Sequence, residues 1–270
     1  MEFEGATAVV TGGAGGLGRA FCEELGRRGG RVLLTDVDAE GAAETVRLVD
    51  VAGGEARFIE ADVRSEERTR EVAEAAADWL GSVDLLVNNA GVGVAGPFDQ
   101  VTLDDWRYCV DINLWGVIYG CHAFVPAMKR RGRGYIINVA SSAGLLAPPD
   151  MGPYNVTKAG VIALSETLYG ELTSHGVNVT ALCPTFFRTN ILEEPRGVHD
   201  DAARRVANKL MDRSKVQAPD VARAALAAVH AGELYSVPMR DGRMYWRLKR
   251  ALPAGFAAIV DRVARSGLLK

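Results

Sequence analysis

Short apolar runs rich in β-branched residues alternate along the chain with longer segments in which apolar residues recur at helical spacing. This alternation is typical of a parallel sheet that is covered by helices on both faces. The pattern predicts strands at residues 6–11, 31–35, 56–60, 85–88, 135–139, 177–182 and 234–237. It predicts helices between and after them, at residues 17–28, 40–51, 66–80, 103–130, 152–175 and 219–231.

The order of these elements predicts an α/β fold: a single doubly wound, Rossmann-type domain over residues 1–270, with a mainly parallel seven-stranded sheet. Residues 185–214 break the alternation, because they form a long polar stretch after the sixth strand. Folds of this class place ligand-covering loops after the carboxyl ends of their strands, so we expect a substrate-covering excursion here. A solvated insertion without a special role is the alternative.

The composition bears on partners and location. Hydrophobic residues make up 48% of the chain and charged residues 24%, and the net charge of −3 gives no reason to expect nucleic acid as a partner. The four cysteines show no paired metal-ligand spacing, so we expect no metal site. The chain shows neither a signal-peptide pattern nor the roughly 18 consecutive apolar residues of a membrane-spanning helix, which favours a cytoplasmic protein.

Residues 240–270 differ from the rest of the chain in charge. They contain eight Lys or Arg against two Asp or Glu, and their apolar residues recur at helical spacing. Basic amphipathic helices of this kind bind anionic membrane surfaces, but they also cover a core, a substrate pocket or a subunit contact. We favour the second interpretation, because the remainder of the chain is acidic and would oppose approach to such a membrane.

A glycine-rich turn joins the first predicted strand to the first predicted helix. It reads TGGAGGLG from residue 11 to residue 18, and glycines allow a backbone to turn tightly and to approach a pyrophosphate closely. The helix that follows offers unpaired N–H groups and a positive dipole end to the phosphates. We therefore expect a dinucleotide cofactor to contact Gly12, Gly15, Gly16, Leu17 and Gly18.

Asp36 ends the second predicted strand, 18 residues after Gly18. A carboxylate at this position accepts hydrogen bonds from the adenosine ribose and repels a 2′-phosphate. No Arg or Lys lies inside the glycine-rich turn or directly after Asp36. The predicted cofactor is therefore NAD rather than NADP, and a strand-end Asp that merely caps the next turn is the alternative.

Two further polar segments follow the third and fourth predicted strands. The first contains Asp62 and Val63, and the second contains Asn89, Ala90 and Gly91. Because the carboxyl ends of parallel strands meet at one edge of a sheet, we predict that these residues brace the cofactor. Each segment taken singly is also typical of an ordinary turn.

Tyr154 and Lys158 open a long helix, and residues four positions apart share one helical face. A nearby ammonium stabilises a phenolate and is expected to lower the pKa of Tyr154 toward working pH, as a general acid/base requires. Ser141 follows the fifth predicted strand, 13 residues before Tyr154, at the same sheet edge as the glycine-rich turn. The tyrosine–lysine spacing alone is common on helices and does not establish a site.

The chain resembles the short-chain dehydrogenase/reductase family, because it carries in order the motifs TGGAGGLG, Asp36, DV at 62–63, NNAG at 88–91, Asn113, Ser141 and YNVTK at 154–158. The resemblance covers residues 6 to about 190. It implies a catalytic tetrad of Asn113, Ser141, Tyr154 and Lys158.

Each residue type suits its implied role. Ser141 would hydrogen-bond the substrate oxygen, and Tyr154 would exchange a proton with that oxygen as hydride moves to or from the nicotinamide. Lys158 would hold the cofactor ribose and lower the pKa of Tyr154, so both residues are expected at the cofactor. Asn113 would position a water that links Lys158 to solvent. Ser142 competes with Ser141, which we favour because its spacing matches the family.

One segment departs from the family pattern after the sixth strand. The family commonly has Pro-Gly, three residues and Thr, whereas here Thr185 follows Pro184, and Thr189 occupies the expected threonine position. Pro184 and Thr189 remain predicted cofactor residues. A side chain at position 185 is expected to narrow the pocket wall beside the nicotinamide.

The residues expected around the substrate are mostly apolar. They lie at 92–97 and 145–151 and include Phe186 and Phe187, with Arg188 as a cation beside them. They predict a lipophilic secondary alcohol or ketone as the small-molecule substrate. One alternative is an NADPH-dependent 3-ketoacyl reductase of the same fold, which Asp36 opposes. The other is a non-catalytic nucleotide-sensing protein, which the intact tetrad opposes.

The helices predicted at 103–130 and 152–175 are apolar over much of their circumference. A helix of this kind usually buries a second face besides the one that covers the sheet. The resemblance implies pairing of these helices across a twofold axis, and hence a homodimer or homotetramer.

Overall fold

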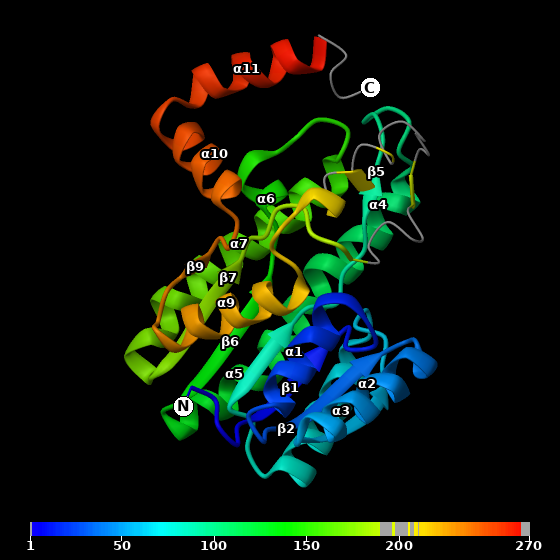
Figure 1. Cartoon of the computed structure of the whole chain (residues 1–270), viewed down its shortest axis with the longest axis vertical. Helices are drawn as coiled ribbons and strands as arrows, with labels where there is room; N and C mark the ends of the chain where they lie inside the picture. Colours follow the sequence, from blue (N-terminus) through cyan, green and yellow to red (C-terminus); the bar gives the residue numbers. More distant parts are fainter. Residues whose placement is uncertain (1, 190–195, 198–204, 206–207, 210, 266–270) are drawn as a thin grey trace.

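Seven parallel strands form the central sheet of the structure, a computed structural model that describes residues 2–189, 196–197, 205, 208–209 and 211–265 (Figure 1). Their order across the sheet is β3 (Glu55–Glu60), β2 (Arg31–Asp36), β1 (Thr7–Thr11), β4 (Leu85–Asn88), β6 (Gly134–Val139), β7 (Val177–Leu182) and β9 (Tyr235–Ser236). The order reverses between β1 and β4, which is the switch point where doubly wound folds bind ligands. The predicted fold class and strand number are confirmed.

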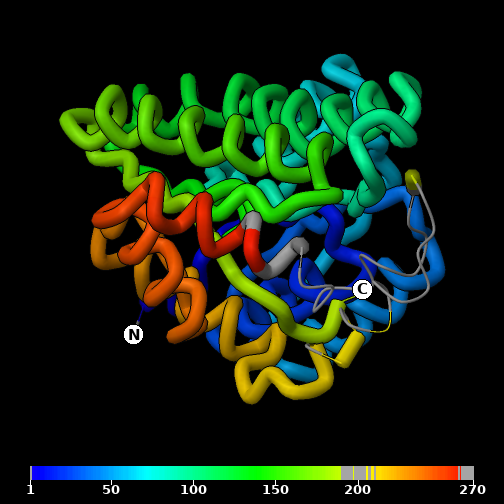
Figure 2. The backbone as a smooth tube through the Cα atoms, turned by 90° about the horizontal axis from the view of Figure 1, so that it is seen from above, coloured from blue at the N-terminus to red at the C-terminus, as the bar shows by residue number. Residues whose placement is uncertain are grey.

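Helices cover both faces of this sheet (Figures 1 and 2). One layer contains α1 (Gly16–Gly26), α2 (Ala39–Ala52) and α9 (Ala218–His230), and the other contains α3 (Glu66–Leu80), α5 (Gly116–Arg131) and α7 (Gly152–Leu172). Successive strand residues point into different layers, so that Val10 packs beneath the first and Val9 beneath the second. Burial on both faces explains why the strands are almost continuously apolar.

The helix predicted at 103–130 is wrong as a single element. The chain forms α4 (Leu103–Val110), then a π-helical turn, η1 (Asp111–Trp115), and then α5. A π turn adds a residue to the helical repeat and appears most often at functional sites. This one carries Asn113 into the interior, where the side chain is fully buried.

Several elements were not predicted from the sequence. The short helix α6 (Ser142–Leu146) follows β6, and a 3-10 turn, η2 (Thr173–His175), ends the α7 segment. A separate two-stranded sheet pairs β5 (Val94–Ala95) with β8 (Arg196–Gly197). Residues 190–195, 198–204, 206–207 and 210 lie outside the described residues, so the predicted substrate-covering role of the 185–214 excursion is not tested there.

The basic C-terminal segment forms two helices, α10 (Arg240–Ala251) and α11 (Pro253–Arg265). They follow β9, and α11 lies at the end of the molecule opposite the N-terminus (Figure 1). Helix α10 packs against α6, at the carboxyl edge of the sheet. Within the described residues, every helix is too short or too polar to cross a membrane.

Candidate active site

The glycine-rich turn lies between β1 and α1, at the switch point of the sheet. Gly16 has a φ of +51°, which L side chains rarely adopt, and a Cβ there would meet open space. Gly18 is required for a different reason, since its Cβ would overlap the Gly12 carbonyl and lie 2.7 Å from Asn89 Nδ2. Gly15 precedes α1 and has no side chain that could cap the helix, so the first N–H groups of α1 have no side-chain partner from the N-cap residue.

Asn89 and Thr11 hold this turn in place. Asn89 Nδ2 donates to the carbonyls of Thr11 (2.9 Å) and Gly12 (3.0 Å). In return, Thr11 Oγ1 accepts from the backbone N–H groups of Asn89 and Ala90. The predicted cofactor residue Asn89 therefore acts in this structure on the loop itself, and the loop gains rigidity before any ligand arrives.

Asp36 lies beside the turn, at the end of β2. Its Oδ2 accepts from the backbone N–H of Ala14 (2.9 Å), and its Oδ1 accepts from Val37 (2.8 Å). The nearby Arg19 donates to the carbonyls of Ala14 and Gly41 and so is held by the backbone. Asp36 thus places a fixed negative charge at the predicted ribose position, next to an arginine that is already engaged.

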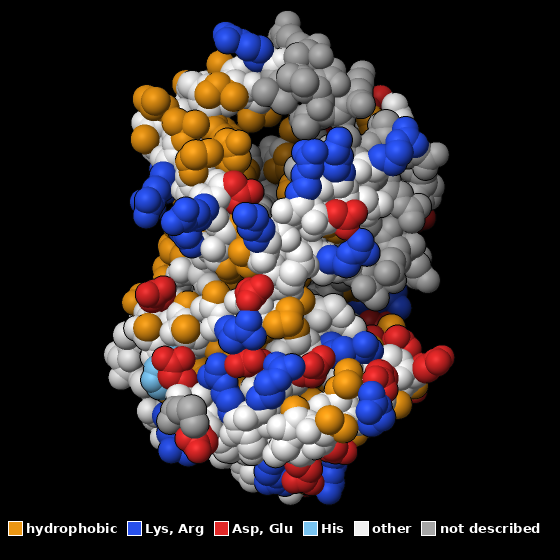
Figure 3. Space-filling view, viewed as in Figure 1, with side chains coloured by type: hydrophobic (Ala, Val, Ile, Leu, Met, Phe, Trp, Pro, Cys, Tyr) orange, Lys and Arg blue, Asp and Glu red, His pale blue; other side chains and the backbone are white. Residues whose placement is uncertain are grey.

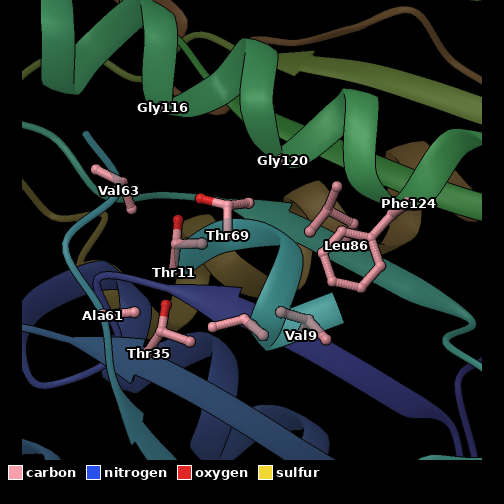
Figure 4. A pocket seen from close by; sticks show the side chains of 11 residues that line it. Val9, Thr11, Thr35, Ala61, Val63, Thr69, Leu86, Gly116, Gly120 and Phe124 are labelled. Carbon is pink, nitrogen blue, oxygen red and sulfur yellow. The ribbon is translucent and has the colours of Figure 1, made fainter. Parts of the chain in front are cut away.

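Asp62 and Val63 follow β3 and differ in what they contact. The Asp62 carboxylate accepts from Arg64 at 2.5 Å, and this hydrogen bond holds the pKa of Asp62 below its usual value. Val63 lines a small pocket with Thr11, Thr35 and the α5 residue Gly116 (Figure 4). Asp62 is thus paired with an exposed arginine and Val63 lines the small pocket, and their predicted contact with a cofactor stays a prediction.

Tyr154 and Ser141 are brought together by α7 and the end of β6. The Ser141 side chain lies near enough to the Tyr154 hydroxyl to influence its pKa, so the two predicted residues are neighbours, and their joint role in catalysis stays a prediction. Ser141 also caps α6, because its Oγ accepts from the Ala143 N–H at 3.1 Å. Burial raises the pKa of Tyr154 to about 12, although the hydrogen bond from Ser141 opposes the rise.

Lys158 is 2% exposed and lies below Tyr154 on the same helix. Its Nζ donates to the Val139 carbonyl at 2.8 Å and lies 5.7 Å from the centre of the Tyr154 ring. Burial lowers the pKa of Lys158 to about 8. The expected lowering of the Tyr154 pKa by Lys158 is therefore wrong, because desolvation by burial raises the Tyr154 pKa.

Asn113 is bound to the backbone of Val92. Its Oδ1 accepts from the Val92 N–H at 2.8 Å, and its Nδ2 donates to the Val92 carbonyl at 2.9 Å. A Cβ at Gly91 would lie 3.2 Å from Asn113 Oδ1 and 3.3 Å from Lys158 Nζ. Two predicted tetrad residues, Asn113 and Lys158, thus meet at this glycine, and the role of Asn113 in positioning a water stays a prediction.

The segment after β7 connects the serine to the C-terminal helices. The Pro184 carbonyl accepts from the Ser142 N–H at 2.9 Å, so the Pro184 turn braces the residue beside Ser141. Thr189 lies at the end of the described run that leaves this turn. Phe187 is buried in the core beneath α1 and α9, which corrects the expectation that it lines the substrate pocket.

The predicted substrate segments lie together at the edge above the tetrad. Gly96 N–H donates to the Asp150 carbonyl at 2.7 Å, and β5 pairs with β8 from the excursion. Phe186 is exposed here, whereas Arg188 forms an ion pair with Asp212 at 2.5 Å. The segments 92–97 and 145–151, both predicted to surround the substrate, are therefore neighbours in the structure.

Two contacts at the site were missed. A Cβ at Gly144 would lie 2.6 Å from the Lys158 carbonyl carbon, so only glycine lets α6 reach α7 this closely. Thr157 contacts Asn113, with 3.4 Å between Thr157 Oγ1 and Asn113 Nδ2. Gly144, the glycine of the SSAG motif at 141–144, could have indicated the first contact from the sequence. The second depends on the π turn, which the hydrophobic pattern does not show.

The comparisons with known proteins agree with this arrangement. The family model for short chain dehydrogenases matches residues 6–197. The chain belongs to the short-chain dehydrogenase family. It is therefore an oxidoreductase with the Rossmann-type fold seen above.

Individual relatives extend the likeness over most of the chain. It is 38% identical to 3beta-hydroxysteroid dehydrogenase 1 of Eggerthella lenta, over 83% of this chain and 86% of that protein. It is 30% identical to C alpha-dehydrogenase of a Sphingobium species, over 97% of this chain and 88% of that protein. Among solved structures, a short-chain dehydrogenase/reductase from Burkholderia phymatum in complex with NAD has a TM-score of 0.87 at 34% identity, covering 93% of this chain and 95% of that one.

Proposed function

We propose that this short-chain dehydrogenase transfers hydride between NAD(H) and a lipophilic secondary alcohol or ketone, with Tyr154 as general acid/base. The observation that carries the proposal is the grouping of Tyr154, the neighbouring Ser141 and the buried Lys158, whose Nζ lies 5.7 Å from the centre of the Tyr154 ring. These groups lie at the same sheet edge as the glycine-rich turn, as hydride transfer from a bound dinucleotide requires.

The residues present fit a dinucleotide. Gly16 leaves open space in front of the α1 N-terminus, where a pyrophosphate meets N–H groups. Gly91 lies beside Lys158, where a Cβ would come within 3.3 Å of the Nζ atom, so glycine keeps a side chain out of the position proposed for the ribose. When bound, the nicotinamide ring of the cofactor supplies or accepts the hydride. Gly12, Gly15, Leu17, Gly18, Ala90, Pro184 and Thr189 complete the proposed cofactor contacts.

The chain's own residues manage the proton and the substrate oxygen. Ser141 hydrogen-bonds that oxygen, and Tyr154 gives it a proton during ketone reduction or takes one during alcohol oxidation. A protonated Tyr154, with a pKa of about 12, is ready to donate. Lys158, with a pKa of about 8, carries a charge that changes near working pH and stabilises the phenolate once the proton has left. Asn113 fixes the Val92 backbone beside Lys158.

The choice of NAD rests on Asp36. Its fixed carboxylate repels a 2′-phosphate, and Arg19 is occupied by the carbonyls of Ala14 and Gly41. The NAD complex of the Burkholderia phymatum relative is consistent with this choice. The same charge opposes the alternative of an NADPH-dependent 3-ketoacyl reductase.

The lipophilic substrate is supported by the surroundings of the site. Phe186, two residues after Pro184, is exposed, and the exposed Arg188 is paired with Asp212. A pocket edge with this character favours an apolar molecule over a carboxylate or phosphate. The two named relatives above act, by their names, on a hydroxysteroid and at a C alpha position.

The test is a screen for NADH formation with NAD and a panel of secondary alcohols, from short aliphatic to steroidal. On the best substrate, Tyr154→Phe removes the transferable proton and should lower turnover roughly 10²–10⁴-fold while NAD binding survives. Tyr169→Phe, on the same helix, is the matched control and should keep wild-type turnover. Near-normal turnover of Tyr154→Phe would contradict the mechanism, and absence of turnover with the whole panel would favour the nucleotide-sensing alternative.

A further inference from the structure

Helices α10 and α11 expose a run of large apolar side chains. Met244, Tyr245, Leu252 and Ile259 are between 45 and 60% exposed. In the space-filling view, hydrophobic side chains gather over these two helices, with basic side chains beside them (Figure 3). We call these four residues the α10–α11 surface. Contiguous apolar exposure of this kind marks an interaction site.

This exposure does not come from a detached helix, because α10 is docked through a different face. Gly242 is buried, and the Trp246 ring lies 4.9 Å from the ring of Tyr235 on β9. Lys249 Nζ donates to the Leu145 carbonyl of α6 at 2.8 Å. These three positions lie along one side of the helix, and Met244 lies on the opposite side, where its side chain is left for another partner. Tyr245 lies at the border of the docked side and is still 45% exposed.

The charge around the surface is strongly positive. The segment 240–270 carries eight basic and two acidic residues, a net of about +6, against about −9 for the rest of the chain. Asp241, one of the two acidic residues, is hydrogen-bonded to Thr185. Within the described part of the chain, Arg247 and Arg262 are exposed and form no ion pair. Arg247 and Arg262 thus flank the apolar side chains with unpaired positive charge.

We propose that the α10–α11 surface binds an anionic lipid membrane, with the two helices lying in the plane of the interface. Apolar side chains that enter the headgroup boundary and arginines that meet lipid phosphates together form the pattern of interfacial amphipathic helices. A second copy of this chain fits less well, because a twofold contact would bring two 240–270 segments together, each with a net charge of about +6. A nucleic acid would satisfy the arginines but leave Leu252 and Ile259 in water.

The acidic remainder of the chain had favoured a pocket-covering role for this segment in the sequence analysis. The structure separates the two roles by face, because Trp246 and Lys249 dock α10 while Met244, on the opposite side of the helix, is 56% exposed. The acidic remainder of the chain repels an anionic membrane, but this repulsion is screened beyond about 10 Å at ordinary salt. The positive charge of the helices that touch the membrane therefore dominates there. Neither the charge nor the exposure depends on which alcohol or ketone the enzyme accepts.

The test is co-sedimentation of the full chain, with NAD present, on phosphatidylcholine vesicles with and without phosphatidylglycerol. We expect binding to the anionic vesicles at low salt, and a several-fold smaller bound fraction at high salt or without the anionic lipid. Leu252→Ser with Ile259→Ser should reduce binding several-fold. Arg247→Gln with Arg262→Gln should do the same and also weaken the salt dependence.

The matched controls are Val51→Ser and Arg47→Gln on α2, which is equally exposed but lies in the other half of the molecule. They should bind vesicles as the wild type does. An unchanged thermal midpoint and an unchanged stabilisation by NAD show that each variant is folded. Absence of binding to anionic vesicles, equal binding to both vesicle types, or wild-type binding by both α10–α11 variants would overturn the proposal. So would light scattering in which the same variants abolish a dimer instead.

Discussion

The hydroxyl of Thr185 lies 3.3 Å from Oδ1 of Asp241, which joins the turn after β7 to the first turn of α10. Thr185 is the residue that departs from the family's glycine, and its methyl group also packs on Gly242, where a Cβ would lie 2.7 Å from it. The side chain at position 185 is therefore directed to the C-terminal segment, and it fixes α10 beside the Ser141–Tyr154 pair. This contact leads to the first prediction.

Gly242→Ala should displace α10, because its new methyl group has no space beside Thr185. Overpacking of this kind costs about 1–3 kcal/mol of unfolding free energy. We also expect a higher KM with little change in kcat, since α10 supports the pocket and not the proton transfer. Thermal unfolding and steady-state kinetics measure the two effects.

The control for this variant is Gly255→Ala on α11. A Cβ there lies 3.6 Å from Leu252 Cβ, an ordinary contact, so stability should be unchanged or slightly increased. Equal stability and equal KM in the two alanine variants would show that the contact between Thr185 and α10 does not support the pocket.

Lys158→Met should stabilise the fold at neutral pH while abolishing activity. Burial lowers the pKa of Lys158 from 10.5 to about 8, a cost of about 3 kcal/mol for the charged form. Loss of the hydrogen bond to the Val139 carbonyl costs the variant about 1–2 kcal/mol, so its unfolding free energy should increase by about 1–2 kcal/mol in total. Chemical denaturation at pH 7 measures the difference.

The pH dependence has a definite sign. Between pH 8 and 10.5 the unfolded lysine binds more protons than the folded one, so Lys158 contributes a rise of stability with pH in this window, and its full cost applies below it. The buried cysteines, whose pKa values are raised by burial, contribute a fall over the same range, so the rise is read from the difference in stability between the wild type and the lysine variant. Lys158→Met should lack this rise, whereas Lys129→Met, an exposed change on α5, should keep it. A stability difference between the wild type and Lys158→Met that stays constant from pH 8 to pH 10 would contradict the assigned pKa.

Replacing Asp36 by Ser and Val37 by Arg should shift cofactor preference toward NADP. The change removes the carboxylate that repels a 2′-phosphate and adds a cation to pair with it at an exposed position. Values of kcat/KM for both cofactors should change in ratio by about tenfold or more. If the wild-type enzyme already prefers NADPH, the assignment of NAD fails before any variant is made.

Trp115 and Val156 are about half exposed, although they lie on the apolar helices predicted to pair in an oligomer. We expect light scattering at micromolar concentration to show a dimer or tetramer. Trp115→Glu should shift the mass toward the 28.9 kDa monomer, because a charge would replace a ring that the predicted pairing of the helices buries. Val51→Glu on α2 is the control and should leave the mass unchanged. A wild-type protein that runs only as the monomer would contradict the pairing.

The sequence by itself determined the architecture of this protein. Strands buried on both faces need continuous apolar runs, and helices need a 3.6-residue period, so both are visible without coordinates. Glycines that permit a turn and residues four apart on one helix are also local features. For this reason the glycine-rich turn and Asp36 could be proposed from local sequence, and Tyr154 and Lys158 from their spacing together with the ordered motifs of the family.

Only the tertiary structure decided how these residues are solvated and what supports them. The pKa of Tyr154 depends on burial from every side and rises, where the local sequence suggested that Lys158 would lower it. The π turn that brings Asn113 to Val92 costs one residue of helical register, which no hydrophobic period reveals. The contact between Thr185 and Asp241 joins positions 56 residues apart. Contacts of that range depend on how the layers close over the sheet, because only the packed fold brings such positions within reach of each other.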